Sequence, residues 1–393
     1  MKRGISILII MFLALGAWAQ TQQGVVADSE KNASQKLKDV AQECYSLFEL
    51  KKLQHDYDSA SYYITTRARL DTTNVQWQLD AGVFLAEYLL REDDYESQQA
   101  IEDQICEYYN RALSYAESLY GNDSPIVGTC YLRLGDMIDC YADPRTDSLE
   151  NYHKALEIMK HNFGDNSIQV ADCYRRIGAV YGQQFNYITR INPFFDQAEY
   201  YTKKALEIYK THYGEYHCAT AICYAETGEV DYFYEDAFPY FEKALAILDS
   251  LGNGVEVTKA EVYIKIAGYY YSGVDKSRSA DMQAEMLDGQ YFIELSTDDQ
   301  GHYEYKEFSS EERTHFENWQ NTLIAISESR LEDYSAALQY YEKALSIYTH
   351  EYGERHPRVV YVNNRIQDIK SDVEFEKSAI EKAKEHLKLL EGK

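Results

Sequence analysis

The sequence predicts an all-α fold, a right-handed solenoid of about seven stacked helical hairpins. The main observation is a pattern of six positions that occurs three times, starting at Ala112, Ala155 and Ala205. Each copy has an aromatic residue at plus 8, Gly at plus 9, Ser or His at plus 12, Tyr at plus 19 and Gly at plus 23. Apolar residues inside the copies follow helical spacing, so the repeated unit is predicted to consist of helices.

Each position of the pattern has a physical reason in the copy that starts at Ala155. Tyr152 to Met159 has apolar residues at i, i+3, i+4 and i+7, which form one face of a helix. Gly164 is predicted to end that helix, because Gly accepts the left-handed conformation of a C-terminal cap. Ser167 stands at the expected N-cap of the next helix. Gly178 lies inside the helix that follows Ser167. Because this glycine recurs in each copy, we expect a neighbouring backbone too close for a side chain.

This pattern resembles the tetratricopeptide repeat, in the kinesin-light-chain-like form with a period of about 42 residues. In that family the first helix carries an aromatic residue, then an aliphatic one, then Gly, matched here by Tyr174, Ile177 and Gly178. The second helix carries two alanines seven residues apart. This feature is matched by Ala198 with Ala205, Ala237 with Ala244, and Ala337 with Ala344. The resemblance implies a solenoid that binds a peptide or protein on its concave face.

The first residues have the pattern of a secretory signal. Lys2 and Arg3 precede an apolar run that ends at Leu15, and Ala17-Trp18-Ala19 is a small-x-small cleavage pattern. A membrane anchor is the alternative, but it needs about 20 apolar residues. We therefore expect residues 1–19 to be a signal peptide and the protein to be exported, periplasmic or secreted, with no direct membrane insertion after cleavage.

The charge of the chain is strongly acidic. Lys and Arg total 39 and Asp and Glu total 65, which gives a net charge of -26. Such a surface repels nucleic acid, so we expect no nucleic-acid partner. A basic partner is compatible with the acidity, and so is a solvated surface with no partner at all. The 38 Tyr residues suit helix seams and binding surfaces alike, because the ring can pack while the hydroxyl stays hydrated.

Three of the seven cysteines occupy one equivalent position of the repeat, nine residues after the glycine that ends a helix. Equivalent positions on successive hairpins lie about 10 Å apart, beyond the reach of a disulfide. We therefore expect Cys130, Cys173 and Cys223 to be small core residues. A disulfide among the other cysteines stays open.

The rest of the chain is assigned from this pattern. Residues 20–33 are predicted to be a linker, and helices to begin near Ser34. The solenoid is assigned to residues 34–357, with a pair of helices expected at 311–329 and 334–350. An insertion at about 288–310 can form a small β-hairpin from residues 291–297 and 302–308, around the turn-like 298–301. Residues 358–393, polar and charged, are predicted to form the C-terminal capping helix.

Catalytic patterns are absent from the sequence. It has no Gly-Lys phosphate loop, no dinucleotide glycine fingerprint and no Gly-x-Ser-x-Gly elbow. His350 and His356 are six residues apart, whereas a zinc-binding helix needs two His four apart. We expect neither an enzyme nor a cofactor or metal.

The resemblance also implies where a partner would bind, because the first helix of each hairpin lines the concave face of the family solenoid. Positions around the family glycine then select groove residues: Arg133, Asp136, Arg175, Arg176, Glu226, Glu229 and Tyr232. The paired Asn that kinesin light chains favour is found only at Asn363 and Asn364, so their ligand mode does not transfer. Arg133, Arg175 and Arg176 could clamp a carboxylate of the partner. Alternatively, they pair with neighbouring acids such as Asp136 or Asp172.

The sequence therefore predicts a non-catalytic envelope scaffold that binds a protein or peptide in the groove of its solenoid. The alternative is a protein that binds glycans or another small ligand through a Tyr-rich surface. The oligomeric state and the identity of the partner are not written in the sequence.

Overall fold

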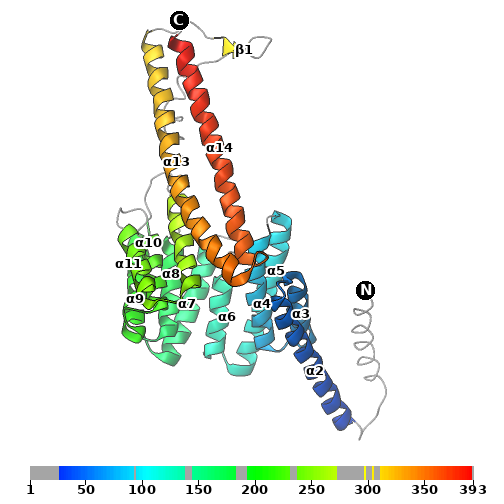
Figure 1. Ribbon diagram of the computed structural model, residues 1–393. Helices are drawn as coiled ribbons and strands as arrows, with labels where there is room; N and C mark the ends of the chain where they lie inside the picture. The colour runs from blue at the N-terminus through cyan, green and yellow to red at the C-terminus, as the bar shows by residue number, and fades with distance from the viewer. Residues whose placement is uncertain are drawn as a thin grey trace. The chain divides into compact units, whose positions relative to one another are not determined.

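The computed structural model describes residues 26–92, 94–137, 144–182, 193–230, 237–271, 296–297, 303–304 and 310–391. The chain divides into two compact units, one that ends at Leu119 and one that begins at Tyr120. Helices dominate both units and pack as consecutive antiparallel neighbours (Figure 1). The predicted all-α solenoid is therefore confirmed. The signal sequence predicted for residues 1–19 lies outside the described residues.

The first unit contains α2 (Val26–Leu53), α3 (Tyr57–Leu70), α4 (Val75–Tyr88), the short 3-10 helix η2 (Leu89–Arg91) and α5 (Tyr95–Tyr120). Side chains cap two of its helices: Asp56 accepts from the Ser59 N–H, and Asn74 accepts from the Trp77 N–H at 3.1 Å. The first helix starts at Val26, eight residues before the predicted start at Ser34, so the predicted linker is wrong from Val26 onward. No Gly or Pro stands between Val26 and Ser34, so nothing stops the helix from extending over this polar segment.

The second unit contains the part of the first copy that follows α5, and the second and third copies. Its helices are α6 (Pro125–Gly135), α7 (Pro144–Phe163), α8 (Ile168–Gly182), α9 (Phe195–Tyr213), α10 (Cys218–Val230) and α11 (Ala237–Leu251), followed by helical residues 256–271. The predicted stop glycines have left-handed backbones: φ is 82° at Gly121, 82° at Gly164 and 84° at Gly214. These residues end α5, α7 and α9, as predicted.

The predicted N-cap of α8 is confirmed, and the equivalent residue of the third copy also caps its helix. The Val170 N–H donates to the Ser167 hydroxyl at 3.3 Å. In the third copy His217 takes the same role, because its Nδ1 accepts from the Ala219 N–H at 3.1 Å. Ser124 occupies the N-cap position of α6, but its side chain makes no capping hydrogen bond.

The interior glycines are crowded, as predicted. A Cβ added at Gly178 would lie 2.7 Å from the Cγ2 of Thr202 and 3.1 Å from its backbone N. At Gly228 the added atom would lie 3.0 Å from the carbonyl oxygen of Ala237. At Gly135 the prediction of a close backbone is wrong, because the neighbour is the ring of Tyr152, 2.5 Å from the added Cβ. The repeat glycine therefore makes room for the following helix in each copy.

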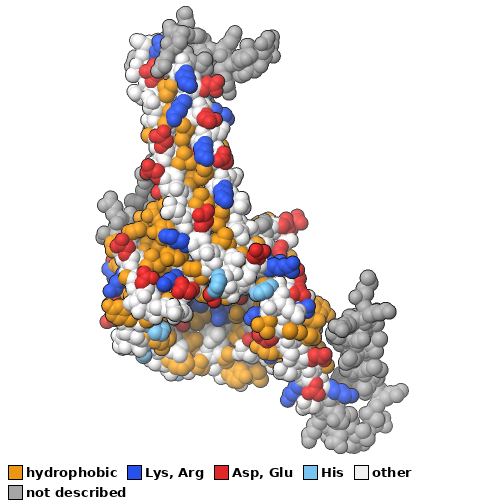
Figure 2. Space-filling view, in the orientation of Figure 1, with side chains coloured by type: hydrophobic (Ala, Val, Ile, Leu, Met, Phe, Trp, Pro, Cys, Tyr) orange, Lys and Arg blue, Asp and Glu red, His pale blue; other side chains and the backbone are white. Residues whose placement is uncertain are grey.

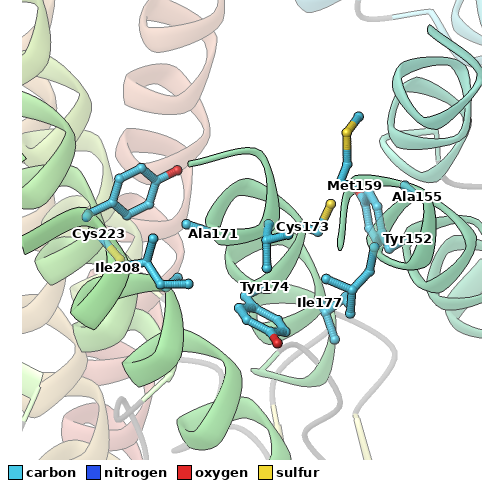
Figure 3. Close-up of a cluster of buried hydrophobic side chains, with 13 residues drawn as sticks. Tyr152, Ala155, Met159, Ala171, Cys173, Tyr174, Ile177, Ile208 and Cys223 are labelled. Carbon is cyan, nitrogen blue, oxygen red and sulfur yellow. The ribbon is translucent and has the colours of Figure 1, made fainter. Parts of the chain in front are cut away.

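The core of the repeats includes the pattern residues Ala155 and Tyr174, whereas the aromatic residue at plus 8 is exposed in all three copies, at 60% for Tyr120, 44% for Phe163 and 39% for Tyr213. Tyr152, Ile177 and Cys173 belong to one buried cluster that α7, α8, α9 and α10 build together (Figure 3). The predicted core cysteines Cys130, Cys173 and Cys223 are each at most 1% exposed. Burial raises the pKa of the Cys173 thiol to about 12. The prediction that these residues are small core side chains is confirmed.

The unit ends in two long helices, α13 (Ser310–Tyr352) and α14 (Pro357–Glu391), which run side by side (Figure 1). The predicted pair of helices at 311–329 and 334–350 is wrong, because one helix covers both ranges. Residues 330–333 contain no Gly or Pro, so the helix continues through them. The predicted capping helix 358–393 corresponds to α14.

A buried polar group connects the two long helices. Arg330 of α13 is 7% exposed and donates to Glu376 of α14, which is 1% exposed, at 3.1 Å. The Ser327 hydroxyl donates to the same carboxylate at 2.7 Å. Because a buried charge must be paired, this group favours the register that brings Arg330 and Glu376 together. Figure 2 shows charged side chains of both signs along the outer surface of the pair.

The predicted insertion is described only in part. Strands β1 (Ser296–Thr297) and β2 (Tyr303–Glu304) pair antiparallel, with Ser296 opposite Glu304 and Thr297 opposite Tyr303. These residues belong to the two predicted strands and have the predicted pairing. The remainder of the predicted insertion between residues 288 and 309 lies outside the described residues.

Candidate functional site

Three of the predicted groove residues meet at the carboxylate of Asp136, at the C-terminal end of α6. Nη1 of Arg133, on the same helix, lies 3.4 Å from Oδ2 of Asp136. Arg176 of α8, on the next hairpin, forms an ion pair with the same carboxylate. The Tyr152 hydroxyl donates to the same carboxylate at 2.9 Å. These contacts occupy both arginines in an internal network, the second of the two arrangements considered from sequence.

Arg175 also pairs within the protein. Its Nη1 lies 2.5 Å from Oε1 of Glu226, one hairpin further along, and its Nε lies 3.8 Å from Asp172. Burial disfavours the charge of Arg175, but Glu226, Tyr209 and Asp172 outweigh it and raise its pKa. The neighbouring groups therefore stabilise the charged guanidinium, and they occupy hydrogen-bond donors that a ligand would otherwise use.

Lys265, which is not among the predicted groove residues, completes this arrangement. Its Nζ lies 2.6 Å from Glu229 and 3.9 Å from Glu226. Burial lowers the pKa of Lys265, and the two carboxylates raise it by more, so the net direction is upward. A signal for Lys265 was present in the sequence. Gly268 occupies the interior-glycine position of the helix at 256–271, and Lys265 stands three residues before it, as Arg175 stands before Gly178.

These side chains line a cavity of about 590 Å³. The first helices of three successive hairpins supply most of its wall, as the resemblance implied for the concave face. Tyrosines from α9, α13 and α14 supply the rest. The lining residues are Asp172, Arg175, Tyr209, Ala219, Ile222, Glu226, Glu229, Glu261, Ile264, Lys265, Gly268, Tyr341 and Tyr361.

Glu226 is the most buried acid of the cavity, at 8% exposure. Its Oε1 accepts from Arg175, whereas no donor of the described residues reaches its Oε2. Burial raises the pKa of the Glu226 carboxyl, and Arg175 and Lys265 counteract the rise. A buried acceptor without a donor costs about 1–3 kcal/mol, and more when it is charged. A donor from outside the chain would remove that cost.

The predicted site residues thus fall into two groups. Arg133, Asp136 and Arg176 form the network at the end of α6, and Arg175 and Glu229 line the cavity. Tyr232 lies outside the described residues. Whether any of these residues contacts a partner stays a prediction.

Two further features bear on chemistry. In the described ranges, no three His, Cys, Asp or Glu side chains gather in a way that could hold a metal ion. Among the helices of those ranges, none has the length and apolar character needed to cross a bilayer.

A family model of the tetratricopeptide repeat matches residues 322–358, which cover the second part of α13 and the first residues of α14. The resemblance to tetratricopeptide repeats is confirmed. Within this matched repeat the two helices that the family separates are fused into one in α13. No protein of known, curated function matches the chain.

Solved structures with similar folds include two that cover most of their own length. The crystal structure of BtubC (BKLC) from P. vanneervenii is 19% identical, covers 70% of this chain and 96% of its own, and gives a TM-score of 0.39. A putative kinesin light chain from Podosopora anserina with nearly identical TPR-like repeats is 8% identical. It covers 54% of this chain and 97% of its own, at a TM-score of 0.40.

Proposed function

We propose that this tetratricopeptide-type protein is a non-catalytic scaffold of the cell envelope that binds a peptide or protein partner in the cavity of its second unit. The single observation that supports the proposal is the cavity itself, about 590 Å³ in volume, on the face formed by α8, α10 and helical residues 256–271. A cavity of this size accommodates one or two side chains of an extended segment. Peptide recognition through such grooves relies on a few anchoring side chains.

Polar and apolar groups both face this cavity, which suits a peptide better than a purely apolar ligand. Ile222 and Ile264 provide apolar wall, and Glu226, Glu229 and Lys265 provide polar groups. Many tyrosines, by contrast, are engaged with each other: the rings of Tyr181 and Tyr201 stack at 5.9 Å, and those of Tyr270 and Tyr340 stack at 6.0 Å. Rings that pack on each other offer little platform for a sugar, so the peptide proposal is favoured over the glycan alternative.

The location in the envelope is part of the proposal and rests on the charged, apolar and small-residue segments at positions 1–19. Determining the N-terminal residue of the protein isolated from its own cells tests this location directly. A first residue at or near Gln20 supports export. A protein that retains Lys2 and Arg3 and is found in the cytosol contradicts it.

The binding proposal is tested by filling the cavity. Ile222→Trp would place a large side chain in the cavity, whereas Glu207→Trp changes a side chain on α9 that is 71% exposed and outside the cavity. Each immobilised variant is compared with the native protein for capture of proteins from an envelope extract, at low and high salt. We expect Ile222→Trp alone to lose a specific bound protein. Equal capture by all three proteins contradicts the cavity as the binding site.

A further inference from the structure

The charges around the cavity are unbalanced. Four carboxylates line it, from Asp172, Glu226, Glu229 and Glu261, against two basic groups, from Arg175 and Lys265. Glu261 forms an ion pair with a residue that does not line the cavity: Nη1 of Arg358, on α14, lies 2.7 Å from Oε1 of Glu261. With that pair set aside, three carboxylates face two cations, and one negative charge remains without compensation.

The distances show which carboxylate oxygen could interact with a positive group of a ligand. Arg175 and Lys265 both point toward Oε1 of Glu226, at 2.5 and 3.9 Å. Oε2 of the same carboxylate is buried and has no donor among the described residues. The Glu226 carboxylate therefore keeps an unsatisfied acceptor beside the cavity, and a ligand that donates N–H to it after a small rotation of the carboxylate gains a charge-assisted hydrogen bond.

A carboxylate from a partner would meet the opposite situation. Both cations of the cavity already hold acids of the chain, Arg175 on Glu226 and Lys265 on Glu229. An incoming anion would have to compete with these acids, and displacing Glu226 from Arg175 would leave a buried carboxylate unpaired, which is strongly unfavourable. The arrangement of Arg175 thus disfavours the carboxylate clamp considered from sequence.

We infer that the cavity binds a cationic side chain, Lys or Arg, of the partner segment, with the ammonium or guanidinium group on Oε2 of Glu226. This inference rests on the proposed function and specifies its partner. Ile222, Ile264 and the ring of Tyr341 would contact the aliphatic stem, which long basic side chains bury readily. The net charge of -26 further favours approach of a basic segment.

The test uses a library of capped nonapeptides, acetylated and amidated, with a fixed central residue and the other positions randomised. Four sub-libraries carry Lys, Arg, Glu or norleucine at the centre; norleucine keeps the length of the Lys stem and lacks its charge. Binding of the purified native protein, Glu226→Gln and Glu207→Gln is measured by fluorescence polarisation. Glu226→Gln retains the shape of the side chain, and Glu207→Gln is the matched loss of an exposed charge.

We expect the native protein and Glu207→Gln to bind the Lys or Arg sub-library about tenfold or more tightly than norleucine, and Glu226→Gln to lose most of that preference. A Lys preference over Arg indicates an ammonium site, and the reverse a guanidinium site. If Glu226→Gln does not fold, Glu229→Gln, whose side chain is 42% exposed, lowers the same negative charge and should weaken the same preference.

Two results overturn the inference in distinguishable ways. Binding of all sub-libraries alike, or a preference for Glu, leaves the cavity as a peptide site and refutes its cationic specificity. No binding of any sub-library at millimolar peptide, in a protein with an intact helical spectrum, refutes both the specificity and the proposed function.

Discussion

The interior glycine of the repeat allows a test of helix packing with two substitutions at equivalent positions and opposite expected signs. Gly178 and Gly268 both lie inside the first helix of a hairpin. A Cβ added at Gly178 would lie 2.7 Å from the Cγ2 of Thr202, and one added at Gly268 would meet no atom within 4 Å. Thr202 cannot easily rotate away, because its hydroxyl donates to the Ala198 carbonyl at 2.9 Å.

The magnitudes follow from two opposing effects. Alanine is favoured over glycine in a helix by about 1 kcal/mol, so Gly268→Ala should stabilise by about that amount. At Gly178 the same gain is offset by crowding that costs about 1–3 kcal/mol, so Gly178→Ala should destabilise by about 1 kcal/mol. The two variants should thus differ by about 2 kcal/mol, or a Tm difference of about 4 °C or more.

Thermal unfolding followed by circular dichroism at 222 nm, with calorimetry on the same samples, measures this difference. The native protein is the reference for both variants. A Gly178→Ala protein as stable as the native one, or equal shifts in the two variants, would refute the reasoning that crowding explains the recurrence of this glycine.

Three further predictions concern other parts of the second unit. Glu376→Ala should lower the free energy of unfolding by about 3–5 kcal/mol, because it removes the buried carboxylate that accepts from Arg330 and Ser327. The exposed Glu374→Ala should cost less than about 1 kcal/mol in the same urea titration. Hydrogen bonds from Lys210 and other neighbours lower the pKa of Glu215 from 4.5 to about 2, so its stabilisation is present above pH 4.5 and is lost as the pH falls toward 2. Urea midpoints of Glu215→Gln should accordingly lie below those of the native protein at pH 6 and converge with them at pH 2; a constant gap would contradict this. Because burial raises the pKa of Cys173 to about 12, its thiol should resist a thiol reagent at pH 8 until the protein unfolds, and rapid native labelling at this residue, mapped by mass spectrometry, would show that the core opens there.

The sequence predicts the repeat itself well, because the repeat depends on local chemistry. A glycine after an aromatic residue ends a helix by its own backbone freedom, and Gly164 with φ of 82° shows this. Alanines seven residues apart pack against the next helix, and Ala198 and Ala205 are both fully buried. Such features require only neighbours along the chain or in the adjacent hairpin.

The sequence predicts the long helices less well, because helix continuity depends on the absence of a stop signal rather than on a positive one. The family pattern placed a break near Leu331, and residues 330–333 contain nothing that ends a helix. The buried pair of Arg330 and Glu376 then holds α13 against α14. Residues 46 apart in sequence give no local sign of this contact.

The candidate site shows the same limit. Arg175 and Glu229, which the offsets from the repeat glycine select, both line the cavity. The pairing of Arg175 with Glu226, 51 residues away, depends on how two hairpins stack, and it converts an apparent anion clamp into a site with excess negative charge. Lys265 was missed because Gly252, which ends the preceding helix, stands one residue before the position that the pattern requires. The pattern was therefore not extended to Gly268.

The most direct test of the binding account is site-specific photo-crosslinking inside the cells that make the protein. A small diazirine amino acid is placed at Ile222, inside the cavity, and separately at Glu207, outside it. Ile222 alone should give a discrete crosslinked product, and mass spectrometry should find the crosslink in a partner segment with a Lys or Arg beside it. A cavity position that yields no product, or the same products as Glu207, would contradict the claim that this cavity is where the protein binds its partner.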